Sequence, residues 1–171
     1  MARTLRWHPE IFQMMQEISG GYFTDSEEPV DPDIYEALVA LNSLPFVRGT
    51  IYSCSGFGAV ADLDMGKTMH LGEHAYVMLS YRMEDPRVAE FHDEMRKISA
   101  GSKPHRNKEF LAHPLGKTIV TYFAVPPVDM RAMKRMMNMQ HGKWLKKVVD
   151  RSNENHAWIG RVKKLAEKYS D

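Results

Sequence analysis

The chain lacks most of the features that define specialised protein classes. Its 171 residues contain one cysteine, which excludes an intramolecular disulfide framework and a thiolate-rich zinc site. No apolar run approaches the roughly 20 residues that a membrane-spanning helix needs, and the sequence has no internal repeat or low-complexity segment. With 43% hydrophobic and 26% charged residues, the composition is typical of a globular protein.

Length and charge predict one domain with a basic end. A chain of 171 residues can bury a sizeable core, and we expect a single domain over residues 1–171. The net charge is only +1, yet residues 131–168 hold 11 Lys and Arg against 3 Asp and Glu. Residues 128–171 are therefore the predicted basic, helical part. The first nine residues lack an apolar signal-peptide core, which together with the single cysteine predicts a cytoplasmic location.

Hydrophobic periodicity predicts an α+β fold. Apolar residues at helical spacing predict helices over 8–18, 31–43, 85–99 and from 128 to near the C-terminus, the last with a break near 152–155. Strands are expected over 46–54, 59–63, 73–82 and 117–125, whereas 101–104 has the composition of a loop. We expect a compact mixed sheet of about three to five strands, packed by helices, with a long helical C-terminal segment.

The turn after the first strand is the strongest candidate for a ligand site. Residues 53–58 read Ser-Cys-Ser-Gly-Phe-Gly, and such small side chains leave backbone N–H groups exposed. Successive N–H groups can form a concave nest for an anion or polar ligand. The predicted ligand-binding residues are Ser53, Cys54, Ser55, Gly56, Gly58 and His74.

The single thiol, Cys54, has two interpretations. A nucleophile needs a thiolate prepared by a nearby imidazole or a helix N-terminus, and no histidine has a spacing that designates it as that partner. A small residue at a strand end more often packs into its surroundings. The sequence favours a packing or ligand-lining role.

Two further patterns are weaker. Residues 61–68 satisfy a relaxed phosphate-loop pattern, but two aspartates stand where the anion binds and no good helix start follows. His70 and His74 share a face on a helix or a strand, but a metal site needs further ligands, so no metal is predicted. His92 lies beside the apolar stripe of its helix, which predicts a hydrogen-bonded imidazole at the edge of the core.

The basic C-terminal segment also has two interpretations. Its cations can bind nucleic-acid phosphates, or they can form an ordinary solvated helix face. The candidates for nucleic-acid contact are Arg131, Lys134, Arg135, Lys143, Lys146 and Lys147. An apolar stripe rich in Met and Trp runs over 130–169, and we expect it in the core or in a homodimer interface.

The segment from 30 to 56 resembles a known family. It contains Val-Asp-Pro-Asp-Ile at 30–34, Leu-Asn-Ser at 41–43, Thr50 and Ser-Cys-Ser-Gly at 53–56. This order is similar to the N-terminal part of the wybutosine-synthesising tRNA methyltransferases, in which a helix ending in Asn-Ser precedes a strand and Ser-(Ser/Cys)-Ser-Gly. The resemblance covers about 30 of 171 residues, and Phe57 stands where the family usually has Arg.

The resemblance implies methyl transfer from S-adenosylmethionine to a modified guanosine of tRNA. Ser53, Ser55 and Gly56 would then line the ligand pocket. The sequence thus predicts a small ligand-binding α/β protein that acts as a tRNA-modifying methyltransferase. The alternative hypothesis is a non-enzymatic module that binds a small molecule or partner and oligomerises through its C-terminal helices.

Overall fold

The computed structural model describes residues 32–56, 74–104, 118–126 and 141–170, together with 131, 135 and 139. The helices in this part of the chain are α2 (Pro32–Ser43), α3 (Arg87–Ile98) and α6 (His141–Lys168). The strands are β1 (Val47–Cys54), β2 (Tyr76–Tyr81), β3 (Gly101–Pro104) and β4 (Ile119–Phe123). The predicted helix over 8–18, the strand over 59–63, and Gly58, His70 and Lys134 lie outside the described residues.

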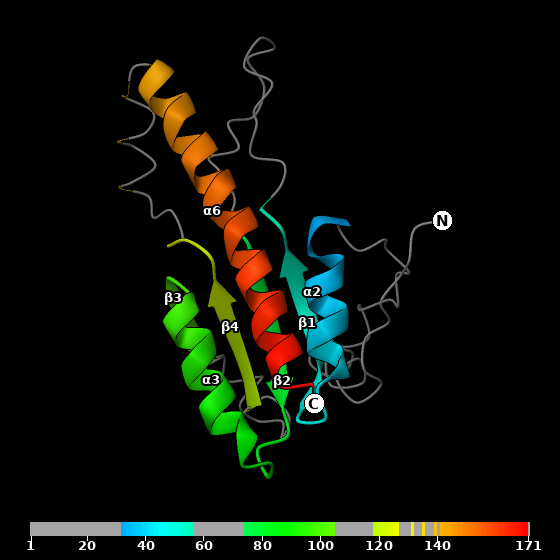
Figure 1. Ribbon diagram of the computed structural model, residues 1–171. Coiled ribbons are helices and arrows are strands. Elements are labelled where there is room, and N and C mark those ends of the chain that lie inside the picture. The colour runs from blue at the N-terminus through cyan, green and yellow to red at the C-terminus, as the bar shows by residue number, and fades with distance from the viewer. Residues whose placement is uncertain are drawn as a thin grey trace, which may run out of the picture.

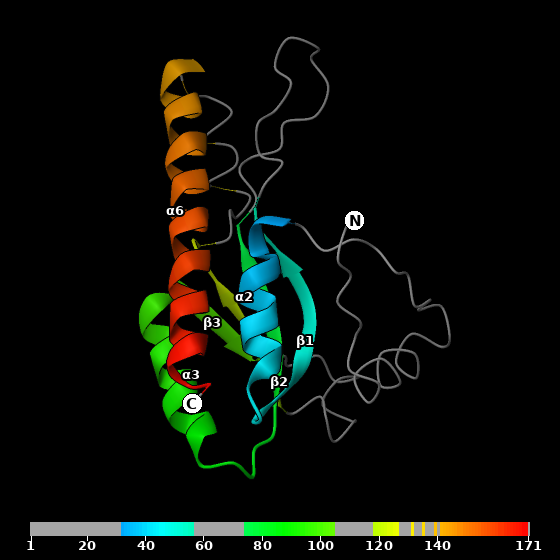
Figure 2. The ribbon, with the colours of Figure 1, turned by 45° about the vertical axis from the view of Figure 1, so that its right-hand side comes forward.

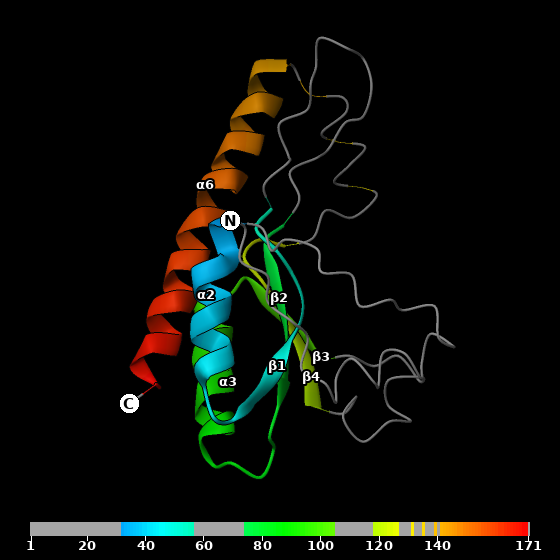
Figure 3. The same ribbon diagram turned by 90° about the vertical axis from the view of Figure 1, so that its right-hand side faces the viewer.

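The described strands form one sheet with the order β1-β2-β4-β3 (Figure 1). Every strand pairing in this sheet is antiparallel, so the described strands form an antiparallel sheet where a mixed sheet was expected. The three helices pack on the same face of the sheet (Figure 3). The predicted α+β class with a long C-terminal helix is confirmed. No helix in the described ranges is both long and apolar enough to span a membrane.

The helix α2 forms and ends for local reasons. Its apolar stripe, Ile34, Leu38 and Leu41, is buried. At its end, the Asn42 amide donates to the Leu38 carbonyl oxygen at 2.8 Å, and its side-chain oxygen accepts the Thr50 N–H at 3.1 Å. Asn42 therefore caps the helix and ties it to β1, so the Asn-Ser pair of the sequence motif has a structural role here.

The core lies between the sheet and the three helices. Its largest fully buried side chains include Trp158, Tyr81, Tyr122, Phe46 and Phe91. In α6, Trp158, Val162 and Ala166 are each 0% exposed. The C-terminal half of the predicted apolar stripe is therefore buried in the core of the monomer and is not available for a homodimer interface.

The prediction of a loop at 101–104 was wrong. Gly101–Pro104 is the strand β3, which pairs with β4 from Gly101 opposite Phe123 to Pro104 opposite Val120. In the described sheet β3 is an edge strand, where a proline costs no ladder hydrogen bond on its outer side and a glycine is tolerated. The loop-like composition of these four residues therefore does not reveal the strand, which depends on pairing with β4.

The predicted break near 152–155 was also wrong. The helix α6 runs without interruption for 28 residues. Asn155 is only 2% exposed, and its side-chain oxygen accepts the Ala75 N–H at 2.9 Å. A polar residue that normally weakens a helix is retained here because its amide satisfies a buried backbone donor of another segment.

A candidate ligand pocket at the end of β1

The chain turns sharply where β1 ends. Ser55 is 3% exposed, and Gly56 has a φ of 71°, in the left-handed region that glycine adopts without strain. The Gly56 N–H donates to the Cys54 sulfur at 3.3 Å. Cys54 thus helps to hold the turn.

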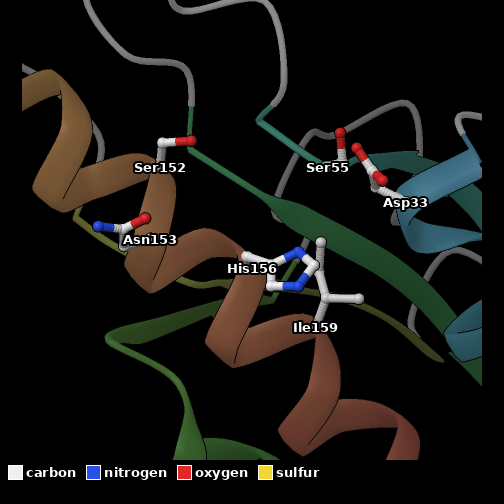
Figure 4. Close-up of a pocket in the computed structure, with 6 residues that line it drawn as sticks. All are labelled: Asp33, Ser55, Ser152, Asn153, His156 and Ile159. Atoms are coloured by element: carbon white, nitrogen blue, oxygen red, sulfur yellow. The ribbon is translucent and has the colours of Figure 1, made fainter.

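A cavity of about 190 Å³ opens at this turn. Its lining residues come from the end of β1, the first turn of α2 and the middle of α6: Asp33, Ser55, Ser152, Asn153, His156 and Ile159. Asp33 and Ser55 lie on one wall, and the imidazole of His156 extends from α6 toward that wall (Figure 4).

Helical geometry explains the contribution of α6. Ser152, His156 and Ile159 are spaced by four and three residues, which places them on one face of the helix. Asn155, next to His156, is anchored to Ala75, and this bond fixes the rotation of the helix at the pocket. The polar wall is therefore supported by a buried hydrogen bond rather than by exposed side chains alone.

The pocket is equipped for binding polar groups. It combines a carboxylate, two hydroxyls, an amide and an imidazole, which can accept from cations and donate to anions. Ser55, His156 and Asp33 are also the residue types of a nucleophilic triad, but no hydrogen bond joins His156 to either of the other two. A serine nucleophile needs its base within hydrogen-bond reach, so the arrangement favours ligand binding.

The structure brings together part of the predicted ligand set. Ser55 lines the pocket, and Ser53, Cys54 and Gly56 belong to the same turn without being among its lining residues. His74 instead packs its ring against Phe123, with ring centroids 5.1 Å apart, and against Tyr76 at 5.7 Å. The described ranges contain no group of three or more His, Cys, Asp or Glu side chains that could hold a metal ion.

Sequence reasoning missed the α6 side of the pocket. Ser152 and His156 have the spacing of residues on one helix face, and that signal was present in the sequence. The prediction of a helix break at 152–155 placed these two residues on different helices, so their shared face was not recognised. Asp33 was not predicted as a pocket residue, although its place in the first turn of α2, where a carboxylate is favourable, is compatible with its place in the pocket wall.

Three of the candidate lysines for nucleic-acid contact lie on the part of α6 that extends beyond the sheet (Figure 1). Arg131, Arg135, Lys143, Lys146 and Lys147 are exposed, and the last three are on the first two turns of α6. This end of the helix projects past the ends of the strands (Figures 1 and 2). Lys146 makes a 3.5 Å contact with Asp150, a weak exposed pair that leaves the segment strongly positive.

Comparison with protein-family models, curated proteins and solved structures finds no match for the chain. The fold and the pocket define an α+β protein with a cavity, lined mostly by polar residue types, at the end of β1. The resemblance to tRNA methyltransferases stays a prediction from residues 30–56.

Proposed function

We propose that this chain is a small-molecule-binding protein whose ligand sits in the pocket of Asp33, Ser55 and His156. The observation that supports this most directly is that Ser55, predicted as ligand-binding from its turn alone, lines a cavity together with polar residues of α6. Polar groups that converge on one cavity from three elements are typical of a specific site.

The lining chemistry favours a ligand that carries both an ammonium and a carboxylate group. The Asp33 carboxylate suits the ammonium, and the hydroxyls of Ser55 and Ser152 can donate to the carboxylate. S-adenosylmethionine has such an amino-acid end, and it is the cofactor that the family resemblance implies. At about 190 Å³, the cavity is smaller than the roughly 300–1,000 Å³ of drug-sized sites, so it would hold this end of the cofactor.

Calorimetry and thermal unfolding with S-adenosylmethionine test this proposal. We expect saturating ligand to raise the melting temperature of the wild-type chain. Asp33→Asn should weaken binding about tenfold or more, because a charge-assisted hydrogen bond is lost. The matched control is Asp93→Asn, an exposed carboxylate on α3, which should bind like the wild type.

Methionine is the second probe in the same experiment. Binding of methionine but not of S-adenosylmethionine would retain the pocket and reject the cofactor. Absence of binding by both probes, or equal binding by Asp33→Asn and wild type, would contradict the proposal.

We further propose that the exposed basic end of α6 binds the phosphates of tRNA. Its lysines lie on a projecting helix, where a nucleic acid can approach without displacing the core (Figure 2). A protein that neutralises phosphates releases counterions, so its affinity falls steeply with salt. The triple variant Lys143→Gln, Lys146→Gln and Lys147→Gln should reduce the slope of log affinity against log salt by about 2–3.

The control for RNA binding changes the same number of charges elsewhere. Lys97, Lys164 and Lys168 are exposed and lie on α3 or on the C-terminal half of α6. Their replacement by Gln should leave the salt slope nearly unchanged. Equal slopes for the two triple variants would reject a specific role for the projecting end.

A further inference from the structure

A second and larger cavity lies at the opposite end of the sheet. The Ser55 pocket is near the start of β2, because Ser55 follows Cys54 and Cys54 pairs with Tyr76. The second cavity is at the end of β2, because Tyr81 lines it. Its volume is about 380 Å³. The walls are mostly apolar, from residues such as Met83, Val88 and Val120, and their polar members include Asp85, His92 and Thr118.

A chain of hydrogen bonds leads from the core to this cavity. The hydroxyls of Tyr81 and Tyr122 are 2.7 Å apart, and the Tyr122 hydroxyl is 2.5 Å from Nδ1 of His92. Tyr81 is 1% exposed and Tyr122 is 0% exposed, whereas His92 is half-buried on α3. The chain therefore joins two buried phenols to an imidazole in the cavity wall.

The number of protons fixes the direction of this chain. Each phenol has one proton to donate. The Tyr81 hydroxyl has Tyr122 as its only partner within the described ranges, so it must donate to Tyr122 to avoid a buried, unsatisfied proton. Tyr122 then accepts from Tyr81 and donates its own proton to Nδ1 of His92.

This direction determines the tautomer of His92. Because Nδ1 accepts a hydrogen bond, the ring is neutral and carries its proton on Nε2. Protonation of Nδ1 would make this nitrogen donate to Tyr122, so that three protons would share two hydrogen bonds and one phenol proton would have no acceptor in the chain. Burial, followed by the nearby charge of Arg96, lowers the pKa of His92 and favours the same neutral form, although Asp93 opposes this.

The remaining nitrogen of His92 is the donor that this cavity offers. The structure shows no partner for Nε2 within the described ranges, and Nδ1 is directed to the buried Tyr122. The carboxylate among the described wall residues, that of Asp85, is already bonded to Arg87 through both oxygens, at 3.0 and 2.7 Å. Among the described wall residues, a ligand therefore meets mostly apolar side chains, the Thr118 hydroxyl, which is 2.8 Å from the Ser80 hydroxyl, and the neutral N–H of His92.

We propose that this cavity binds a small, mostly apolar molecule with a neutral carbonyl group, whose oxygen accepts a hydrogen bond from Nε2–H of His92. A neutral carbonyl fits better than a carboxylate, because the tyrosine chain keeps the imidazole uncharged. The site is distinct from the Ser55 pocket, and its ligand class is different.

Two probes of the same shape test the proposal. Acetophenone carries a carbonyl oxygen, and ethylbenzene has the same aromatic body without an acceptor. Titrations of the full chain should give acetophenone about fivefold tighter binding, the difference expected for one hydrogen bond. Nitrogen-15 NMR of the histidine rings should show the proton of His92 on Nε2 before and after the titration.

Variants connect the probe preference to His92. His92→Phe should remove the preference for acetophenone, and His92→Gln should restore it in part, because its amide nitrogen can replace Nε2. His156→Phe, in the other pocket, is the matched control and should keep the wild-type preference. A proton found on Nδ1, equal affinity for both probes in the wild type, or absence of acetophenone binding would overturn the proposal.

Discussion

The two ends of the sheet carry different kinds of buried polar group. At the end near Ser55, the buried Asn155 accepts a hydrogen bond from a backbone N–H, and polar side chains from α2, β1 and α6 line the adjacent pocket. At the end near Tyr81, the buried hydroxyls bond each other and His92, and the adjacent cavity is mostly apolar. One end presents several hydrogen-bonding groups to a ligand, whereas the other uses its polar groups to fix a single donor.

This difference has a structural origin. In α6, polar residues at helical spacing face the end of β1, so that wall is built from side chains that remain open to a ligand. The residues of α3 that line the second cavity, Val88, Ala89 and His92, are apolar apart from His92. The same sheet can therefore hold two unlike ligand sites, and four predictions test whether the two ends differ as described.

The largest expected effect is at Asn155. Asn155→Ala removes the acceptor of the buried Ala75 N–H and should destabilise the fold by about 2–3 kcal/mol, since an unsatisfied buried donor retains its full desolvation cost. Urea unfolding measures this change. Asn153→Ala, two residues earlier and exposed, should change stability by less than about 0.5 kcal/mol. Equal effects would show that Asn155 does not anchor this end.

At the other end, the two tyrosines should respond unequally. Tyr122→Phe leaves both the Tyr81 proton and Nδ1 of His92 without a partner, and should cost about 2 kcal/mol. Tyr81→Phe leaves the bond from Tyr122 to His92 intact, and should cost less than about 1 kcal/mol. Unfolding of both variants in urea measures the asymmetry, and equal costs would contradict the proposed direction of the chain.

The same contrast explains what the sequence could predict. Helical and strand periodicity located α2, β1, β2, α3 and β4, because each depends on a local apolar pattern. Asn155 and Gly101 were misinterpreted because their roles depend on partners 80 and 22 residues away, Ala75 and Phe123. Ser55 was found from the local chemistry of its turn. For His92, the sequence predicted a hydrogen bond but not its partner, because Tyr122 lies 30 positions away.

A smaller effect is expected at the turn beside Ser55. Gly56 has a positive φ, and any Cβ there is strained, so Gly56→Ala should destabilise the fold by about 1 kcal/mol. Gly56→Asn should cost less, because asparagine tolerates the left-handed region better than alanine. Thermal unfolding of the two variants gives the comparison. A stabilised Gly56→Ala variant would contradict the turn geometry that shapes the pocket.

The smallest expected effect is the pH dependence that arises from His92. Its pKa is lowered in the folded protein by burial and then by Arg96, so the unfolded chain takes up a proton at higher pH than the folded one. The stabilisation from neutral His92 is therefore complete above the ordinary histidine pKa of about 6.5 and is lost as the pH falls through the lower folded value. The pKa of Asp85 in the same wall is lowered to about 2 by hydrogen bonds from Arg87, so Asp85 stays ionised over this range.

Urea unfolding between about pH 8 and pH 5 isolates the contribution of His92 when wild type and His92→Gln are compared, because the other histidines are common to both. The wild type should lose more stability than the variant as the pH falls. A steeper loss in His92→Gln would mean that the folded protein favours the charged imidazole. That result would remove the neutral donor on which the contrast between the two ends of the sheet depends.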